Sequence, residues 1–367
     1  MKTKTLSIFV ALACAFCCCN EKPEAGSTSA KRLVVEPTSV SVAAEEQTVL
    51  LNVTAEADWG LTPAVSWIRT IPTGGIKGTT DVKVIVSANL GSKPREGSVL
   101  LRCGSTKVEI PVRQEGLGEE ALVPDGYSLV WSDEFDDPSP TTPDETDWWY
   151  ETAEPGWVNN ELQTYVAGKI GDIVTADVSD GTLKIHAIKS GDRVYSARVN
   201  TKRNWTYGYF EARLKLPKGK GTWPAFWMMP SVWSGWPEGG EIDIMEHVGA
   251  DLNEVSSSIH CKAYYHAINT QKTAKRILNG ATDDFHIYAL EWTPEYIRTY
   301  VDGQQLFHYN PDDYPKGRNA DTWPFNKPFE LKLNLAWGGD WGGYKGIDES
   351  CLPQTYEIDY VRVFQKQ

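Results

Sequence analysis

Beyond residue 19 the sequence has little cysteine, with only Cys103, Cys261 and Cys351 remaining. These three are far apart and odd in number, so they predict no disulfide framework, and we expect each to be a small core residue. The same region contains no Cys-x-x-Cys and no His-x-x-x-His spacing. The sequence therefore predicts no zinc site of the kind that such spacings mark.

The sequence also has fewer basic than acidic residues, and it has little helical periodicity. Lys and Arg number 36 against 49 Asp and Glu, which gives a net charge of −13. An acidic chain argues against nucleic acid and anionic lipid as partners. Because no segment shows a long 3.6-residue period, the sequence disfavours a βαβ architecture. With 367 residues and 41% hydrophobic content, the chain is long enough to hold two cores.

Residues 1–19 resemble a bacterial lipoprotein signal. Two lysines precede an apolar core from Leu6 to Ala13, which is far too short to span a membrane. The resemblance implies that one cysteine is lipidated and anchors an exported protein to the cell envelope, at the outer membrane or surface of a Bacteroidetes-like bacterium. A plain secretory signal is the alternative, and residues 20–31 are interpreted as a tether. The cysteines that qualify for lipidation are Cys14, Cys17, Cys18 and Cys19.

Residues 32–116 have the pattern of a small all-β domain. Short alternating runs such as Val49–Val53 and Val82–Val86 are separated by Gly, Pro, Asn and Ser, which is typical of an antiparallel β-sandwich. The block resembles the BACON module, an immunoglobulin-like domain of Bacteroidetes glycosidases. The resemblance implies either binding of carbohydrate or mucin, or a spacer that holds the enzyme off the membrane. We favour the spacer, because few of its aromatic residues are expected to be exposed.

A linker from Gly116 to Asp125 leads into a second domain, residues 122–367. Strand patterns recur there between turn signals such as Asp180-Gly181 and Asp302-Gly303. The fold class predicted for this domain is all-β, a large two-sheet sandwich of jelly-roll type with a concave face for a polymer.

Three carboxylates lie close together in the segment Gly239–Gly249, at Glu241, Asp243 and Glu246. In a regular strand the first two share a face and Glu246 points to the opposite one. One extra residue, a β-bulge, would return Glu246 to the face of the others. Close carboxylates raise at least one pKa, and a pair about 5–5.5 Å apart is the arrangement of a retaining glycosidase. A solvated acidic edge or a calcium site are the alternatives.

The same segment resembles the catalytic motif of glycoside hydrolase family 16, in its bulged, laminarinase-like form. The resemblance implies that Glu241 is the nucleophile, Glu246 the general acid and base, and Asp243 the residue that orients the nucleophile. It implies no cofactor for catalysis. Further segments match the family in order over residues 122–367: Trp131–Phe135, Asn159–Tyr165, Tyr207–Arg213, Trp223–Pro230, Glu291–Pro294 with Val301–Gly303, Leu333–Gly339 and Tyr356–Val363.

The second domain is rich in tryptophan, with thirteen of the fifteen in the chain. Aromatic platforms suit the flat faces of sugar rings, although core packing is the commoner role of any one tryptophan. Trp236 flanks the catalytic segment, and His260 alternates onto a face that the family uses for subsites. The family usually has a small aliphatic residue at the position of Trp337. We expect the larger indole of Trp337 to narrow a subsite. The resemblance also implies substrate contacts for Asn160, Arg198, Trp223, Trp227 and Trp341.

The resemblance implies one further feature, and the sequence itself indicates another. A structural calcium ion is expected at Glu134, the carbonyl of Gly181 and Asp359, with two solvated carboxylates as the alternative. The segment Tyr264–Gln271 is expected to be a loop that closes over the cleft.

The predicted function is that of an exported, monomeric, endo-acting retaining β-glycosidase. Its expected substrate is a β-1,3-glucan or a mixed-linkage β-1,3-1,4-glucan. One alternative is an endo-β-galactosidase for poly-N-acetyllactosamine, mucin O-glycans or galactans. The other is a surface glycan-binding protein without catalysis, which the presence of all three carboxylates argues against.

Overall fold

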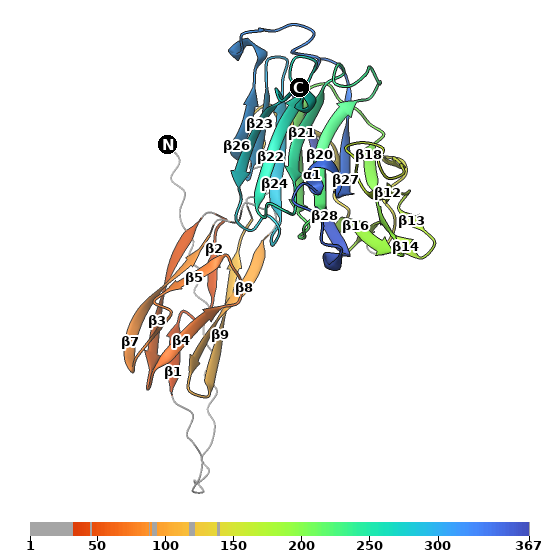
Figure 1. Cartoon of the computed structure of the whole chain (residues 1–367). Coiled ribbons are helices and arrows are strands. Elements are labelled where there is room, and N and C mark those ends of the chain that lie inside the picture. Colours follow the sequence, from red (N-terminus) through yellow and green to blue (C-terminus); the bar gives the residue numbers. More distant parts are fainter. Residues whose placement is uncertain are drawn as a thin grey trace. The chain divides into compact units, whose positions relative to one another are not determined.

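The computed structural model describes residues 32–44, 46–87, 89, 94–116, 122–137 and 140–366. The predicted signal and tether, residues 1–31, lie outside the described residues. The chain forms two compact units, one made of most of residues 33–111 and the other dominated by residues 112–367. Each unit is an all-β structure (Figure 1), in agreement with the predicted fold class. The domain boundaries at residues 116 and 122 stay a prediction.

The smaller unit consists of two sheets with the strand orders β1-β3-β7-β5 and β2-β9-β8-β4-β6. Alternate residues of its longer strands are buried, as the sequence pattern predicts, and Trp59 and Cys103 belong to its core. Its strands are β1 (Leu33–Glu36), β2 (Val40–Val42), β3 (Gln47–Ala55), β4 (Trp59–Pro63), β5 (Ile68–Ile71), β6 (Gly74–Gly75), β7 (Gly78–Val86), β8 (Arg95–Cys103) and β9 (Thr106–Gln114).

The larger unit is built on a seven-stranded and a ten-stranded sheet. The seven-stranded sheet has the order β11 (Trp148–Tyr150), β18 (Arg198–Thr201), β27 (Phe329–Trp337), β20 (Thr222–Pro230), β21 (Glu241–His247), β22 (Glu254–His260) and β23 (Lys272–Ile277). The ten-stranded sheet has the order β12 (Gln163–Tyr165), β17 (Arg193–Ser196), β16 (Thr182–Ser190), β28 (Gln354–Lys366), β19 (Gly208–Lys215), β24 (His286–Trp292), β25 (Ile297–Val301) and β26 (Gln304–Tyr309), with β10 (Tyr127–Asp133) paired to β28 and β15 (Ala176–Ser179) paired to β16.

The remaining elements of the larger unit are short. They are the hairpin strands β13 (Lys169–Ile170) and β14 (Ile173–Val174), the 3-10 helices η1 (His266–Ile268), η2 (Pro311–Asp313) and η3 (Glu349–Cys351), and the helix α1 (Gly339–Gly342). Within the described ranges no helix has the length and apolar character to cross a membrane. The absence of a long helical period in the sequence agrees with this all-β architecture.

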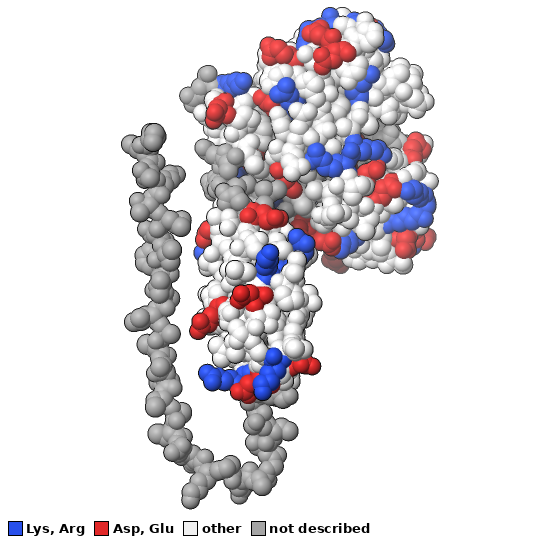
Figure 2. Space-filling view, turned by 90° about the vertical axis from the view of Figure 1, so that its left-hand side faces the viewer, with Lys and Arg blue, Asp and Glu red and all other residues white. Residues whose placement is uncertain are grey.

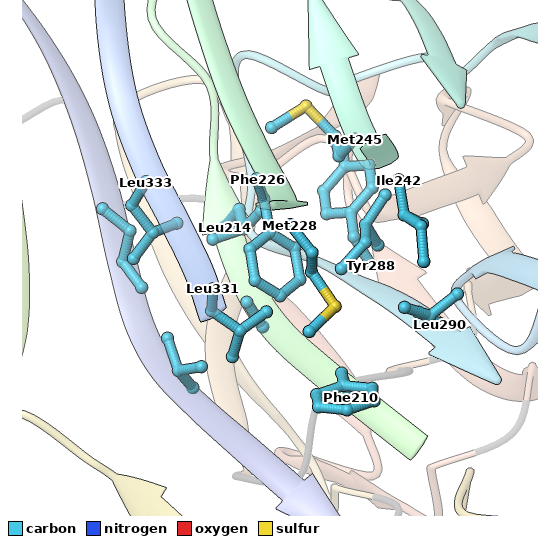
Figure 3. Close-up of a cluster of buried hydrophobic side chains, with 14 of the residues drawn as sticks. Phe210, Leu214, Phe226, Met228, Ile242, Met245, Tyr288, Leu290, Leu331 and Leu333 are labelled. Atoms are coloured by element: carbon cyan, nitrogen blue, oxygen red, sulfur yellow. The ribbon is translucent and has the colours of Figure 1, made fainter. Parts of the chain in front are cut away.

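The two large sheets bury their facing side chains in one hydrophobic core (Figure 3). Phe210 and Leu290 come from the ten-stranded sheet, and Phe226, Ile242 and Leu333 come from the seven-stranded sheet. Because side chains alternate along a strand, the other face of the seven-stranded sheet is left for polar and aromatic residues. This outer face carries the candidate site.

Of the three cysteines beyond residue 19, two lie in the core, as expected from the sequence, and the third is partly buried. Cys103 and Cys261 are fully buried and Cys351 is half-buried, and all three are free thiols. On the face shown in Figure 2, Lys and Arg side chains are interspersed with Asp and Glu side chains.

Candidate active site

The strand β21 contains the predicted bulge. Asp243 pairs with Ser258 and Glu246 with Ser256, so three steps along β21 oppose two steps along β22. The extra residue lets both Ile244 and Met245 enter the hydrophobic core. Glu246 therefore returns to the face of the other two carboxylates, as a bulge requires.

All three carboxylates line one cleft of about 570 Å³ on the outer face of the seven-stranded sheet. The cleft extends across β11, β18, β27, β20 and β21 and includes loops at its rim. Its walls contain six tryptophans, which suits a flat, hydroxyl-rich ligand. These are Trp149, Trp157, Trp223, Trp227, Trp233 and Trp236.

Two of these tryptophans each donate a hydrogen bond to a catalytic-motif carboxylate. The indole Nε1 of Trp236 lies 2.6 Å from Oε2 of Glu241. The indole Nε1 of Trp223 lies 3.1 Å from Oε1 of Glu246. The two carboxylates are thus fixed by aromatic side chains that also form the cleft walls.

Two of the three carboxyl groups, those of Asp243 and Glu246, have a raised pKa. Burial, followed by the negative charge of Glu241, raises the pKa of Asp243 well above its ordinary value. Burial, followed by the charge of Asp243, raises the pKa of Glu246 well above its ordinary value, against smaller opposing effects of His260 and Trp223. Glu246 is therefore suited to hold a proton at neutral pH, as a general acid must.

Arg198, for which the resemblance implies substrate contacts, lies in the cleft wall. Its guanidinium lies over three aromatic rings, with distances to the ring centroids of 4.8 Å for Trp157, 4.9 Å for Tyr165 and 5.3 Å for Trp227. Its Nη1 also lies 3.5 Å from Oε2 of Glu151. These contacts orient Trp157 and Trp227 relative to each other.

Three of the predicted substrate residues lie beside the cleft lining instead of within it. The amide of Asn160 donates to both carboxylate oxygens of Asp340, at 2.9 and 3.0 Å, and the neighbouring Asn159 lines the cleft. Trp341 packs edge-on against Trp223, with ring centroids 5.2 Å apart. His260 is buried, and its Nε2 lies 3.4 Å from Oδ2 of Asp243.

Trp337 does not contact the cleft, and the expectation that it narrows a subsite is wrong. It is fully buried in the core between the sheets. The reason is strand alternation along β27, where Leu331, Leu333 and Leu335 point into the core and Trp337 has the same parity.

The alternate residues of β27, which point away from the core, line the cleft, and the sequence analysis did not predict them. Glu330, Lys332 and Asn334 all line the cleft. The amine of Lys332 lies 2.8 Å from Glu330, 3.3 Å from Glu151 and 3.1 Å from the side-chain oxygen of Asn200. The alternating segment Phe329–Trp337 contained the signal for these three, whereas the partners of Lys332 on other strands were not predictable.

The loop after β22 places an unpredicted histidine in the cleft. His266, in η1, lines the cleft and packs on Trp236 with ring centroids 5.0 Å apart. Tyr265 contacts the same indole edge-on at 5.6 Å. This loop therefore already covers the indole that holds Glu241.

The residues expected to bind calcium have protein partners. Glu134 accepts hydrogen bonds from Arg362 at 2.9 and 2.7 Å. Asp359 accepts one from Arg213 at 2.7 Å. Gly181 has a φ of +74°, which suits the tight turn between β15 and β16. A guanidinium next to each carboxylate does not fit a cation site as it stands, and the calcium ion stays a prediction.

Comparison with known proteins agrees with this geometry. The sequence pattern described as Glycosyl hydrolases family 16 matches residues 159–362. The chain is 44% identical over 250 residues to a β-glucanase of Rhodothermus marinus, covering 65% of this chain and 85% of that protein. It is 36% identical over 248 residues to a keratan-sulfate endo-1,4-β-galactosidase of Sphingobacterium multivorum, covering 65% of this chain and 55% of that protein.

The fold shows the same relationship. The X-ray structure of the laminarinase from Rhodothermus marinus matches with a TM-score of 0.61 at 43% sequence identity, covering 65% of this chain and 97% of that one. Sequence, fold and the bulged row of carboxylates therefore lead to one conclusion: this chain belongs to glycosyl hydrolase family 16.

Proposed function

We propose that the protein is an endo-acting, retaining β-glycosidase that cleaves a β-1,3-glucan or a mixed-linkage β-1,3-1,4-glucan. The observation that carries this proposal is the bulged strand β21, which places Glu241, Asp243 and Glu246 side by side in a tryptophan-lined cleft. From the carboxylates on β21 the cleft extends across four further strands, which gives room for several sugar units of a polymer.

The chemistry takes two steps. In the first, a carboxylate oxygen of Glu241 attacks the anomeric carbon, and the glycosidic bond breaks as Glu246 gives its proton to the leaving oxygen. In the second, Glu246, now ionised, takes a proton from water, whose oxygen attacks the same carbon and releases Glu241. Two inversions at one carbon leave the product with the β-configuration.

Asp243 acts through its neighbour in this scheme. Its pKa beside Glu241 is raised well above the ordinary value, so it takes up a proton readily, and in its protonated form it donates a hydrogen bond to the nucleophile instead of repelling it. Trp236 donates from the other side at 2.6 Å. Both contacts fix the orientation of Glu241 before the substrate binds.

Proton NMR of the first product tests this mechanism. The spectrum should show a β-anomer that mutarotates later. An initial α-anomer would contradict the retaining assignment.

Both the relatives and the charge of the cleft support an uncharged glucan. The lining contains six carboxyl side chains but only two cationic ones, Arg198 and Lys332, and both cations are next to Glu151. An anionic chain such as a sulfated galactan would meet an excess of like charge. The similarity to a keratan-sulfate galactosidase nevertheless keeps an endo-β-galactosidase as the second candidate.

Release of reducing sugar from laminarin, lichenan, keratan sulfate and mucin separates these candidates. We expect the highest rate on laminarin or lichenan. A higher rate on keratan sulfate or mucin would favour the galactosidase. No release from any polymer, combined with binding to one of them, would indicate a glycan-binding protein without catalysis.

We also propose that the protein is exported and lipid-anchored, with the smaller unit as a spacer. The support is the sequence of residues 1–19, which lie outside the described residues, and the β-sandwich of residues 33–114. Labelling with a radioactive fatty acid, with Cys14, Cys17, Cys18 and Cys19 replaced by Ser one at a time, tests the anchor. If all four variants kept the label, the proposed lipid anchor would be contradicted.

A structural calcium ion at Glu134, Gly181 and Asp359 is a proposal from the family resemblance alone. Adding calcium to protein that has been treated with EDTA should raise the melting temperature if the ion binds there. An unchanged melting temperature would indicate that Arg362 and Arg213 hold these carboxylates instead.

A further inference from the structure

The pairing of β21 with β22 places a histidine beside two of the carboxylates. Glu241 and His260 are directly opposite each other in the ladder, and Asp243 is two residues further along the face of Glu241. Cross-strand and diagonal neighbours of this kind are close enough for their side chains to interact. One carboxylate oxygen from each acid and one ring nitrogen of His260 all lie within 4.8 Å of one another.

This cluster contains a buried acceptor without a hydrogen-bond partner. Asp243 is only 2% exposed, and its Oδ2 has no hydrogen bond to the described residues. The same oxygen is directed at His260, 3.4 Å from its Nε2. An unsatisfied buried carboxylate oxygen is costly, and a cation between these three side chains would satisfy it.

The donor set selects the class of ion. One imidazole nitrogen and two carboxylate oxygens form a mixed set typical of zinc and other borderline transition metals. Calcium and magnesium prefer oxygen ligands alone. No short sequence spacing marks such a site, because His260 comes from a neighbouring strand.

We propose that Glu241, Asp243 and His260 form a reversible inhibitory site for zinc and similar divalent transition metals. The ion reaches the site through the cleft, since Glu241 and Asp243 line it. A metal bound to Glu241 takes the oxygen lone pair that attacks the sugar. Metal and substrate therefore compete for the same free enzyme. This inference concerns metal binding and goes beyond the proposed hydrolysis.

Isothermal titration calorimetry of the purified, EDTA-treated full chain with zinc chloride tests the binding. We expect one high-affinity zinc ion per chain and no comparable heat with magnesium or calcium chloride. His260→Gln should weaken zinc binding by at least about tenfold. His308→Gln is the matched control. His308 also lies beside a carboxylate, with its Nε2 3.6 Å from Oδ2 of Asp313. It belongs to β26 of the ten-stranded sheet and not to the sheet that carries the cleft.

A second variant guards against misfolding of His260→Gln. Glu241→Gln changes a cleft residue and should also weaken zinc binding by about tenfold or more. Binding that is unchanged in both variants, or that is lost in His308→Gln instead, would overturn the proposal. Calorimetry needs no turnover, so this result is independent of whether the protein hydrolyses glucan.

Steady-state kinetics then test the inhibition. Zinc should raise the apparent KM of the wild-type protein without changing kcat, and EDTA should restore full activity. The zinc concentration for half inhibition should increase at least about tenfold in His260→Gln, relative to that variant's own activity without metal. A zinc effect on kcat alone, or equal sensitivity of the two proteins, would contradict a site at these residues.

Discussion

Trp236 donates its indole hydrogen to Oε2 of Glu241 across 2.6 Å. The same indole is covered by His266 and Tyr265 from the loop after β22. An aromatic side chain thus connects the wall of the cleft with the carboxylate that we assign as nucleophile. A substrate sugar that contacts the cleft wall at Trp236 meets a nucleophile that is already oriented.

Trp236→Phe keeps most of the aromatic surface but removes this hydrogen bond. A hydrogen bond to a charged group is worth about 1.5–3 kcal/mol, so we expect kcat to fall about 10- to 100-fold. Trp233→Phe is the control, because Trp233 lines the same cleft and is 67% exposed. Equal kcat values for the two variants would show that the bond to Glu241 has no role in turnover.

Glu246→Gln should stabilise the fold at neutral pH while it abolishes polymer cleavage. The folded-state pKa of Glu246 is raised, so the folded protein binds this proton more tightly than the unfolded chain. The favourable contribution of this group to the free energy of unfolding is fully present at pH values below its ordinary pKa of 4.5. It is lost as the pH rises through the higher pKa of the folded protein. Calorimetry should therefore show a melting temperature about 2–4 °C above wild type at pH 7. The difference should vanish near pH 4, and a gain that is equal at both pH values would contradict the raised pKa.

Lys332→Met tests the charged cluster on β27. Lys332 is buried between Glu330 and Glu151, and its loss leaves Glu330 without its cation and Glu151 with Arg198 alone. Breaking a buried pair from one side costs about 3–5 kcal/mol in the free energy of unfolding. Urea denaturation measures this cost. The control Lys262→Met breaks an exposed pair with Asp321 at 3.1 Å and should cost less than about 1 kcal/mol.

The sequence predicted features that depend on local alternation. The spacing of Glu241, Asp243 and Glu246 predicted the bulge, and the pairing of β21 with β22 confirms it. The same rule, applied to Phe329–Trp337, would have placed Trp337 in the core and Lys332 in the cleft. The expectation for Trp337 is wrong because the parity of β27 turns this side chain into the core, whatever residue the family has at the position.

Contacts between distant strands could not be predicted from the sequence. Lys332 meets Glu151 and Asn200 only because β27 lies close to β11 and β18 in one sheet. His260 meets Asp243 only through the register of β22 on β21. Strand order and register are set by long-range pairing, which a single sequence does not reveal.

Residues 117–367 alone should hydrolyse soluble polymer. Every cleft residue lies in the larger unit, so the smaller unit is not needed to complete the site. Reducing-sugar release by the truncated chain should equal that of the full chain within about twofold, since no transition-state contact is lost. A folded but inactive truncation, judged by circular dichroism, would show that the smaller unit contributes to the site.

The roles of Glu241 and Glu246 can be separated with an activated aryl β-glycoside and azide. Glu246→Ala should lose most cleavage of polymer but keep reactivity toward the aryl glycoside, whose leaving group needs little protonation. Asp243→Asn should lower the rate without changing the product.

The identity of the glycosyl azide formed by each alanine variant is the most direct test of the mechanism. With Glu246→Ala, azide should speed turnover and give a β-glycosyl azide, because a small anion replaces the water that has lost its base. With Glu241→Ala, azide should give at most an α-glycosyl azide by single displacement. A β-glycosyl azide from Glu241→Ala would contradict the account and exchange the roles of the two carboxylates.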